Sequence, residues 1–257
     1  MNKLIIDFEN EEIQILESEN SHSHKFSTEK AFNAVAQAYL RLGWDNKYVY
    51  SFKWLGRPII QLPDDIIRLQ ELIYEVKPDV IIDIGIAHGG SLIFNSTLLK
   101  TYGGRKVIGI DIDIREKNLK AIKEHKMFDQ IELIQGNSIS DDVFFEAKKF
   151  IKESDTVMVF LDGKHTYDHV YKELEIYSKL ITKGSYIVAM DGIQRDLVGA
   201  PRTNPDWQTN NPANAAEDFV KNNENYEIDL RIPSFNEGNI KQHVTYWPSA
   251  YIKKIND

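Results

Sequence analysis

The sequence predicts an α/β protein with a mostly parallel, doubly wound sheet and an antiparallel edge strand. Between Pro63 and Met190, short apolar runs alternate with segments in which apolar residues recur at helical spacing. Strands and helices that alternate in this way build a parallel sheet with helices on both faces. After Gly192 the alternation ends, and two later β-like segments are expected to close the sheet as antiparallel elements.

The individual elements follow from this pattern in chain order. A helix is expected over residues 64–76, directly after Pro63, and a strand of apolar residues then ends at Asp83. Helical spacing predicts further helices over residues 91–101, 115–125, 141–152, 167–181 and 213–221. Short apolar runs predict strands over residues 106–111, 130–134, 156–161, 186–190, 226–231 and 243–253. Ligands of such sheets bind outside the carboxyl ends of the strands.

The first part of the chain has a different character. Residues 1 to about 30 are largely polar and show no firm helical or strand period, whereas Thr28 to Leu42 have a helical pattern. We therefore expect an N-terminal arm and helix over residues 1–50, which could mediate self-association into a homo-oligomer, and one main domain over residues 51–257. His22 and His24 lie in a serine-rich segment, where a pair of histidines is more often incidental than a metal site.

Composition and charge argue against several classes of function. The formal net charge is -8 and the pI is near 5.4, whereas nucleic-acid and anionic-membrane partners require concentrated basic surface. The chain contains no cysteine, which excludes disulfides, thiolate metal clusters and a cysteine nucleophile. It shows no signal-peptide pattern and no apolar stretch of about 20 residues. These features predict a cytoplasmic protein that binds small neutral or cationic ligands.

Residues 79–91 predict a cofactor pocket. An apolar strand ends in the carboxylate of Asp83, and a glycine-rich turn then leads directly into a helix. Gly85, Gly89 and Gly90 supply the backbone freedom for a tight crossing beneath a ligand. A turn that only connects the strand to the helix is the structural alternative.

Two nucleotide cofactors use such a turn. Gly85-x-Ala87-x-x-Gly90 has the spacing of the dinucleotide fingerprint, with alanine in the middle position. Asp83 favours S-adenosylmethionine instead, because a carboxylate attracts its cationic amino and sulfonium groups and repels a pyrophosphate. The turn alone leaves both cofactors open.

Polar residues follow every strand of the predicted parallel sheet: Asp83; Asp111 with Asp113; Asn137 with Ser138; Asp162 with His165; and Asp191. Asp111 lies about 20 residues beyond the glycine turn, where a carboxylate usually binds the ribose hydroxyls, and a helix cap is the alternative. Asp162 and Asp191 should end neighbouring strands, so their oxygens can converge on magnesium or a similar cation.

His165 could accept the proton of a substrate hydroxyl bound there, because the imidazole titrates near neutral pH. His169 follows one helical turn later and either faces the same cleft or is an exposed helix residue. The segment from Val198 to Pro212 is too long and too rich in turn residues for an ordinary connection, so we expect a lid around Trp207.

Several sequence segments together resemble those of one known family. They are Trp54–Gln61, Pro63–Ile73, Lys77–Ser91, Leu161–His169 and the tail Trp247–Lys254. As an ordered set covering about residues 50–257, they resemble the cephalosporin hydroxylase and rhamnosyl O-methyltransferase family. The resemblance implies a Rossmann-like class I methyltransferase that uses S-adenosylmethionine and a divalent cation such as Mg²⁺. The implied acceptor is a hydroxyl of a small molecule or glycan, such as a sugar or another natural product.

The resemblance also implies roles for residues of this chain. Those expected around the methionine moiety of the cofactor are Asp83, Gly85, Ala87, His88, Gly89, Gly90 and Ser91. Asp111 would bind the ribose, and Asn137 or Ser138 would lie near the adenine. Asp162 and Asp191 would bind the cation, while His165 would be the base, with Asp162 assisting catalysis.

The sequence departs from the family pattern at the last parallel strand. Similar proteins often place two acids, or an acid and an amide, side by side there, whereas Met190 precedes the single carboxylate of Asp191. Two other functions therefore stay open at this point. One is a nicotinamide-dependent oxidoreductase, favoured by the glycine spacing, and the other is a non-catalytic assembly protein with a methyltransferase fold.

Overall fold

The computed structural model describes residues 3–17, 20–233, 235–238 and 240–256, which form two compact units. The smaller unit draws on residues up to 48 and on residues 231–245. The larger unit comprises residues 49–230 and the chain from residue 246 onward. Each unit has its own sheet. The candidate functional residues named above all belong to the larger unit.

The smaller unit contains a three-stranded antiparallel sheet where the sequence pattern predicts only a polar arm. Its strands are β1 Lys3–Asp7, β2 Glu12–Glu17 and β3 Asn20–Lys25, in the order β1-β2-β3. The prediction was wrong because β3 consists of serine, histidine and other polar side chains, which are mostly exposed. Backbone pairing with β2 forms this strand, and it buries too little apolar surface to show a sequence period.

Helix α1 Glu29–Asp45 packs on this small sheet and confirms the predicted helix. Thr28 caps it, because its hydroxyl accepts a hydrogen bond from the backbone N–H of Ala31 at 3.3 Å. Ile13 of β2 packs against Ala31 and Ala34 of the helix. These three residues form a small buried cluster, against which the partly buried Leu4 and Ile15 pack.

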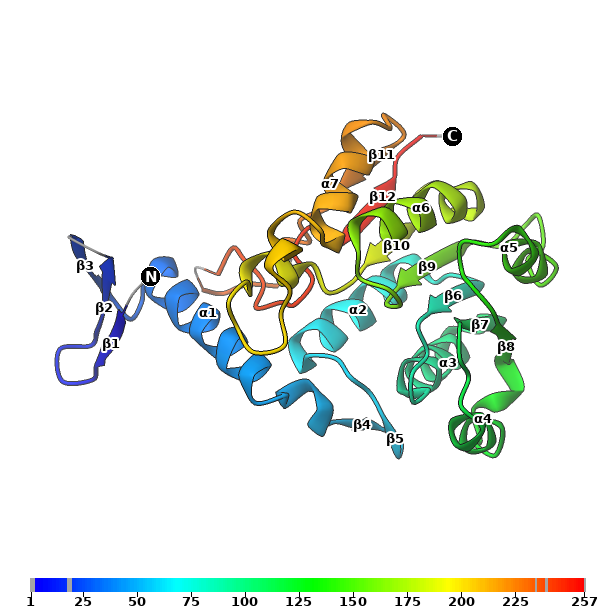
Figure 1. Ribbon diagram of the computed structural model, residues 1–257, viewed down its shortest axis with the longest axis horizontal. Coiled ribbons are helices and arrows are strands. Elements are labelled where there is room, and N and C mark those ends of the chain that lie inside the picture. The colour runs from blue at the N-terminus through cyan, green and yellow to red at the C-terminus, as the bar shows by residue number, and fades with distance from the viewer. Residues whose placement is uncertain (1–2, 18–19, 234, 239, 257) are drawn as a thin grey trace. The chain divides into compact units, whose positions relative to one another are not determined.

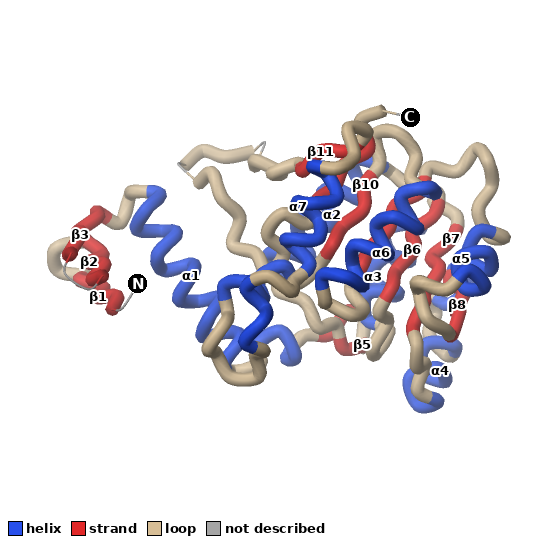
Figure 2. The backbone as a smooth tube through the Cα atoms, turned by 45° about the horizontal axis from the view of Figure 1, so that its top comes forward, coloured by secondary structure: helices blue, strands red, loops and turns tan. Residues whose placement is uncertain are grey.

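The larger unit has a seven-stranded sheet in the order β11-β12-β10-β9-β6-β7-β8 (Figures 1 and 2). Its parallel strands are β6 Val80–Ile84, β7 Lys106–Asp111, β8 Ile131–Gln135, β9 Val157–Leu161 and β10 Tyr186–Ala189. Their ends differ from the predicted ends by at most one residue. The parallel α/β fold is therefore confirmed.

Two strands complete the sheet beyond β10, namely β11 Tyr226–Ile228 and β12 Tyr251–Lys254. β12 is the antiparallel strand and lies between β10 and β11, so β11 is the edge strand. The strand predicted over 243–253 is wrong in its first part. Pro248 lacks an N–H for pairing and Ser249 has a φ of 57°, so the chain turns there before β12 begins.

Helices cover both faces of the sheet (Figures 1 and 2). On one face lie α5 Asp141–Lys148, α6 Tyr167–Tyr177 and α7 Pro212–Lys221, and on the other lie α2 Pro63–Val76, α3 Gly90–Tyr102 and α4 Glu116–Lys123. The strands between these layers are apolar runs, and every residue of β6, β9 and β10 is buried. Burial on both faces explains why these strands show no alternation of polar and apolar residues.

Two predicted helices end early. Helix α5 stops at Lys148 because the following turn is held by Asp155, whose carboxylate accepts a hydrogen bond from the backbone N–H of Lys152 and pairs with Arg105. Helix α6 stops at Tyr177 and continues as a short 3-10 turn. The short elements of the chain are β4 Lys53–Trp54, β5 Arg57–Pro58, η1 Tyr48–Ser51, η2 Phe128–Gln130, η3 Ser178–Leu180, η4 Gly192–Asp196 and η5 Pro205–Gln208.

Among the described residues, we find no helix that is both long and apolar enough to cross a membrane.

Candidate active site

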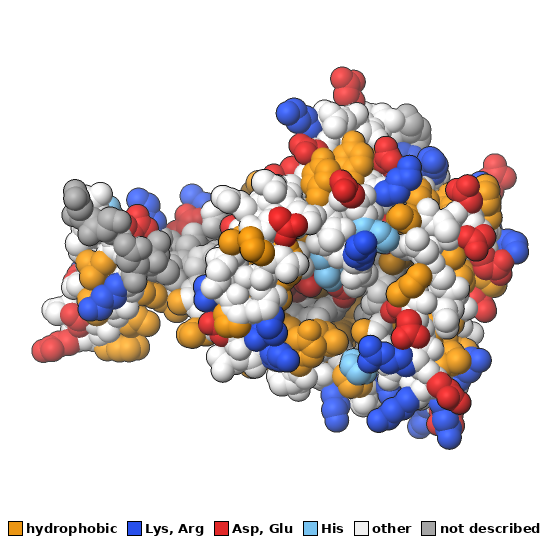
Figure 3. All heavy atoms as spheres, in the orientation of Figure 1, with side chains coloured by type: hydrophobic (Ala, Val, Ile, Leu, Met, Phe, Trp, Pro, Cys, Tyr) orange, Lys and Arg blue, Asp and Glu red, His pale blue; other side chains and the backbone are white. Residues whose placement is uncertain are grey.

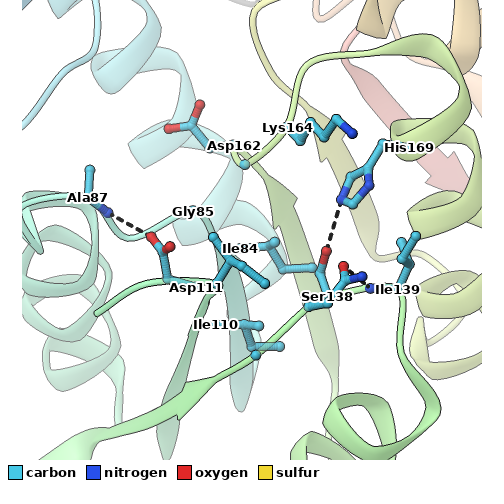
Figure 4. A pocket seen from close by; sticks show the side chains of 14 residues that line it. Ile84, Gly85, Ala87, Ile110, Asp111, Ser138, Ile139, Asp162, Lys164 and His169 are labelled. Carbon is cyan, nitrogen blue, oxygen red and sulfur yellow. Dashed lines mark hydrogen bonds between the residues drawn. The ribbon is translucent and has the colours of Figure 1, made fainter. Parts of the chain in front are cut away.

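A cavity of about 520 Å³ opens at the carboxyl ends of β6, β7, β8 and β9, where ligands of parallel sheets bind. The space-filling view shows a hollow on this face of the larger unit, with acidic and histidine side chains close to it (Figure 3). Ala87 and Asp111 lie at one end of the cavity, and Ser138, Ile139 and His169 lie at the other (Figure 4). A cavity of this size suits a nucleoside-sized ligand.

Asp111 holds the glycine turn in place. Its Oδ2 accepts hydrogen bonds from the backbone N–H groups of Ile86 at 3.0 Å and Ala87 at 3.2 Å. Its Oδ1 accepts from the backbone N–H of Asp113 at 3.0 Å. The carboxylate therefore lines the cavity and also fixes the turn, a contribution that the sequence did not indicate.

The glycines of the turn allow close packing against the protein itself, and Gly85 also lines the cavity where a ligand would lie. A Cβ on Gly85, whose φ is +95°, would lie 2.1 Å from the backbone oxygen of Asp162. A Cβ on Gly90 would lie 2.1 Å from the backbone oxygen of Pro58. The turn thus packs directly against the end of β9 on one side and against β5 on the other.

Asp83 lies beneath the turn and is 1% exposed. Burial raises the pKa of this carboxyl to about 7, hydrogen bonds from Ser91 and Asn95 oppose that rise, and the charge of Asp111 adds to it. The Asn95 amide donates to Asp83 Oδ2 at 3.2 Å. Asp83 is not among the described residues that line the cavity.

The remaining residues of the predicted cofactor set divide between two hollows. The cavity is lined by six of the predicted site residues, namely Gly85, Ala87, Asp111, Asn137, Ser138 and Asp162. A smaller recess beside it is lined by His88, Gly90 and Ser91, again with Gly85, Ala87 and Asp162. Gly89 lines neither hollow among the described residues, because its Cα faces the side chain of Ile122.

Ser138, His169 and Glu173 form a polar group at the far end of the cavity. His169 Nε2 lies 3.2 Å from both Ser138 Oγ and Glu173 Oε1, and the serine hydroxyl donates to the same carboxylate oxygen. Glu173 is 1% exposed. The sequence left His169 undecided and gave no sign of Glu173, because a glutamate on an amphipathic helix usually faces solvent.

Asp162, His165 and Asp191 come together beside the cavity. Each offers one ligand atom, and these atoms all lie within 4.8 Å of one another. His165 Nε2 is 3.5 Å from Asp191 Oδ2 and 3.9 Å from Asp162 Oδ1. Asp191 has a left-handed φ of 62°, a conformation that aspartate adopts more readily than most residues with a side chain.

Burial, followed by the charges of Asp191 and Asp83, raises the pKa of Asp162 well above its usual range. Gln61, which lies two residues before α2, partly offsets this rise, because its Nε2 donates to Asp162 Oδ2 at 3.4 Å. Two carboxylates held this close repel each other unless a proton or a cation lies between them. The cluster therefore has the donor set and the electrostatic demand of a divalent-cation site.

The long segment after Gly192 is ordered by side-chain amides. Asn211 caps α7 by accepting from the backbone N–H of Asn214 at 2.9 Å, and its own amide donates to the Trp207 carbonyl oxygen. Asn210 accepts from the backbone N–H of Tyr167 at the start of α6. These bonds hold the predicted lid segment beside the helix that carries His169.

A model of the family described as rhamnosyl O-methyltransferase/CmcI matches residues 46–255 of this chain. The chain belongs to this family. Members of the rhamnosyl O-methyltransferase/CmcI family are S-adenosylmethionine-dependent O-methyltransferases, so the enzyme class and the cofactor follow. The family resemblance noted from the sequence is confirmed.

Two curated relatives are rhamnosyl O-methyltransferases. The one from Mycobacterium leprae is 23% identical over 161 residues, which cover 62% of this chain and 68% of the relative. The one from Mycobacterium tuberculosis is 24% identical over 162 residues, which cover 62% of this chain and 64% of the relative. The matched region therefore spans about two thirds of the length of these relatives.

The solved structure of CmcI without ligand shares the fold of this protein. It has a TM-score of 0.55 at 17% identity, and the match covers 81% of this chain and 78% of CmcI. CmcI with magnesium and S-adenosylmethionine gives a TM-score of 0.53, also at 17% identity, over 80% of this chain and 78% of CmcI. The Rossmann-like class I methyltransferase fold is therefore confirmed.

Proposed function

We propose that this protein transfers the methyl group of S-adenosylmethionine to a sugar or natural-product hydroxyl, assisted by a divalent cation at Asp162 and Asp191. One observation carries the proposal: Asp162 lines the cofactor cavity and also belongs to the cluster with His165 and Asp191. The methyl donor and the acceptor oxygen would then meet at a single residue. Such alignment removes a large entropic part of the barrier to methyl transfer.

The cofactor supplies a methyl group on a positively charged sulfur, which makes the carbon electrophilic. In this chain, Asp111 would accept hydrogen bonds from the ribose hydroxyls at one end of the cavity while it holds the turn. Ser138 and Ile139 at the far end (Figure 4) would lie beside the adenine, as would Asn137, which lines the same cavity. Gly85 and Ala87 line the cavity beside Asp162, which suits the methionine moiety.

A divalent cation in the cluster would lower the pKa of a bound hydroxyl and fix its orientation. Asp162 and Asp191 would hold it with carboxylate oxygens, the ligands that magnesium prefers. The raised pKa of Asp162 shows the cost of keeping both carboxylates ionised in a partly buried site. A cation would remove that cost, and this is the feature of the cluster that favours metal binding.

His165 would be the base that accepts the hydroxyl proton at Nε2, because this atom faces both carboxylates. The carboxylates would stabilise the imidazolium that results. Its Nδ1 is buried and has no hydrogen-bond partner among the described residues. Nδ1 carries the proton whether Nε2 accepts the hydroxyl proton or binds the cation, so its surroundings do not separate a base from a third metal ligand.

A sugar with vicinal hydroxyls is the acceptor class that we favour, since the relatives from mycobacteria are rhamnosyl O-methyltransferases. The segment from Val198 to Pro212 would exclude water above the acceptor, as a lid does. A cytoplasmic location and self-association through residues 1–50 stay predictions.

The nicotinamide alternative is disfavoured by the turn. In a dinucleotide-binding protein, the N–H groups at the start of the helix point toward the pyrophosphate. Here the Asp111 carboxylate accepts from the N–H groups of Ile86 and Ala87, which places a negative charge where the pyrophosphate would lie. This arrangement suits a cationic methyl donor better.

The proposal is tested by methyl transfer from radiolabelled S-adenosylmethionine to sugar-nucleotide and glycan extracts, with Mg²⁺ or with a chelator. We expect Asp162→Asn and His165→Gln to lower the rate by about a hundredfold or more. Binding of S-adenosylhomocysteine, measured by calorimetry, should remain within a few-fold, and Asp113→Asn is the exposed control. Cofactor binding with no transfer to any acceptor would instead support the non-catalytic assembly protein.

A further inference from the structure

Gln61 has an unusual environment for an amide. Its side chain is 4% exposed and lies against the cluster described above. Its Nε2 is 3.4 Å from Asp162 Oδ2 and 3.6 Å from Met190 Sδ. Its Oε1 is buried and has no hydrogen-bond partner among the described residues. Buried amide oxygens nearly always have a partner, so this one requires an explanation.

The position of Gln61 explains how the cluster works with a single acid at the end of β10. Met190 is the residue beside Asp191, and a thioether is a poor ligand for a hard cation. The Gln61 amide touches this thioether and the Asp162 carboxylate together. Gln61 therefore brings an amide group to the side of the cluster where Met190, at the end of β10, offers no oxygen ligand.

We propose that Gln61 is a ligand of the divalent cation and that its amide oxygen replaces the missing acid beside Asp162 and Asp191. The inference rests on the proposed cation site. Without a cation, the carboxylate of Asp162 attracts the Nε2 end of the amide, as the structure shows. With a cation, rotation about the terminal side-chain torsion exchanges the two ends, because that torsion is broad and roughly two-fold.

The presence of the cation should therefore decide which end of the Gln61 amide faces the carboxylates. An oxygen turned toward two carboxylates would be repelled in the absence of a positive charge, whereas the N–H end would be repelled in its presence. A neutral amide also gives the site one negative charge less than a third carboxylate would. The affinity of such sites rises with the number of charged ligands, so the natural site should bind its cation weakly.

The test is calorimetric titration of the full-length protein with Mn²⁺, in the absence of cofactor and acceptor. We expect Gln61→Leu and Gln61→Asn to weaken Mn²⁺ binding by at least about tenfold, because both remove the oxygen from its position. Gln61→Glu should tighten binding by about tenfold or more, because it restores a third carboxylate. Circular dichroism at each step shows whether the variants are folded.

Gln130→Leu is the matched control. Gln130 also has a buried Oε1 without a partner among the described residues, but its amide donates to the Gly104 carbonyl oxygen at the start of β7, remote from the cluster. This variant should bind Mn²⁺ as the natural protein does.

Three results would overturn the inference. The first two leave the proposed function intact, whereas the third would also remove the cation site on which that function relies. Equal Mn²⁺ affinity of the natural protein and Gln61→Leu would show that the amide is no ligand. Weaker binding in Gln61→Leu without tighter binding in a folded Gln61→Glu would show that Gln61 only positions Asp162. Undetectable Mn²⁺ binding by the natural protein would remove the site itself. Mn²⁺ binding that depends on Gln61, together with methyl transfer that persists in chelator, would refute cation assistance and leave the ligand assignment intact.

Discussion

Replacement of Asp83 by asparagine should change how the stability of the protein depends on pH. This carboxyl is 1% exposed, and burial raises its pKa to about 7 from an ordinary value of 3.8. The folded protein therefore binds this proton more tightly than the unfolded chain does. The stability that the proton contributes is fully present below pH 3.8 and is lost as the pH rises through about 7.

The size of the effect follows from the pKa. Each pKa unit corresponds to about 1.4 kcal/mol, and between about pH 5.5 and pH 8.5 only the folded form of Asp83 loses its proton. The residue should therefore lower the free energy of unfolding by about 2 kcal/mol over this interval. Asparagine keeps the shape of the side chain and can still accept the hydrogen bond from Asn95. Asparagine carries no charge at any pH, so the free energy of unfolding of the variant should not fall over this interval for this reason.

The assay is urea unfolding, followed by far-UV circular dichroism, of the natural protein and Asp83→Asn at both pH values. The difference in stability between the two proteins should shift by about 2 kcal/mol in favour of the variant on going from the lower to the higher pH. Asp113→Asn removes an exposed carboxylate and should show no such shift. Parallel pH dependence in the natural protein and Asp83→Asn would refute the argument that burial controls this pKa.

Two further predictions concern the cluster and the turn. Because the pKa of Asp162 is raised, protons compete with the cation for this carboxylate. The affinity for Mn²⁺, measured by calorimetry, should therefore rise with pH by up to about tenfold per pH unit, and binding should release protons. An affinity that does not depend on pH would contradict this prediction. Gly85→Ala should destabilise the fold by at least about 2 kcal/mol in urea unfolding, because its Cβ would lie 2.1 Å from the Asp162 carbonyl oxygen. Gly184→Ala is the control, because its φ is also positive and nothing lies within 4 Å of the added Cβ; equal losses would assign the effect to backbone strain alone.

The parallel sheet was predictable because β6, β9 and β10 are buried on both faces. Each reads as an apolar run, and the strand ends of β6, β7, β9 and β10 are marked by Asp83, Asp111, Asp162 and Asp191. The rule that ligands bind at the carboxyl ends of parallel strands then brought these acids to one edge of the sheet. The same rule identified Asp162, His165 and Asp191 as a group, and the structure places them within reach of one another.

Residues outside that rule could not be found from the sequence. Gln61 lies in a connection before α2, so no strand end points to it, and its partners Asp162 and Met190 are 101 and 129 positions away. Glu173 looks like a solvated helix residue until its contact with His169 is known. The small N-terminal sheet was missed because β3 is held by backbone pairing and carries no apolar period.

The insertion of β12 between β10 and β11 has a consequence for how the protein folds. Residues 251–254 pair with β10 on one side and with β11 on the other, although β11 precedes them in the chain. The edge strand cannot join the sheet until this later segment is in place, so the contacts that complete the sheet form only after residues 251–254 have been synthesised. Until then, β10 has an unpaired edge of buried, apolar residues, which is the kind of edge that other chains can pair with. This protein should therefore be most prone to aggregation before β12 has paired with β10.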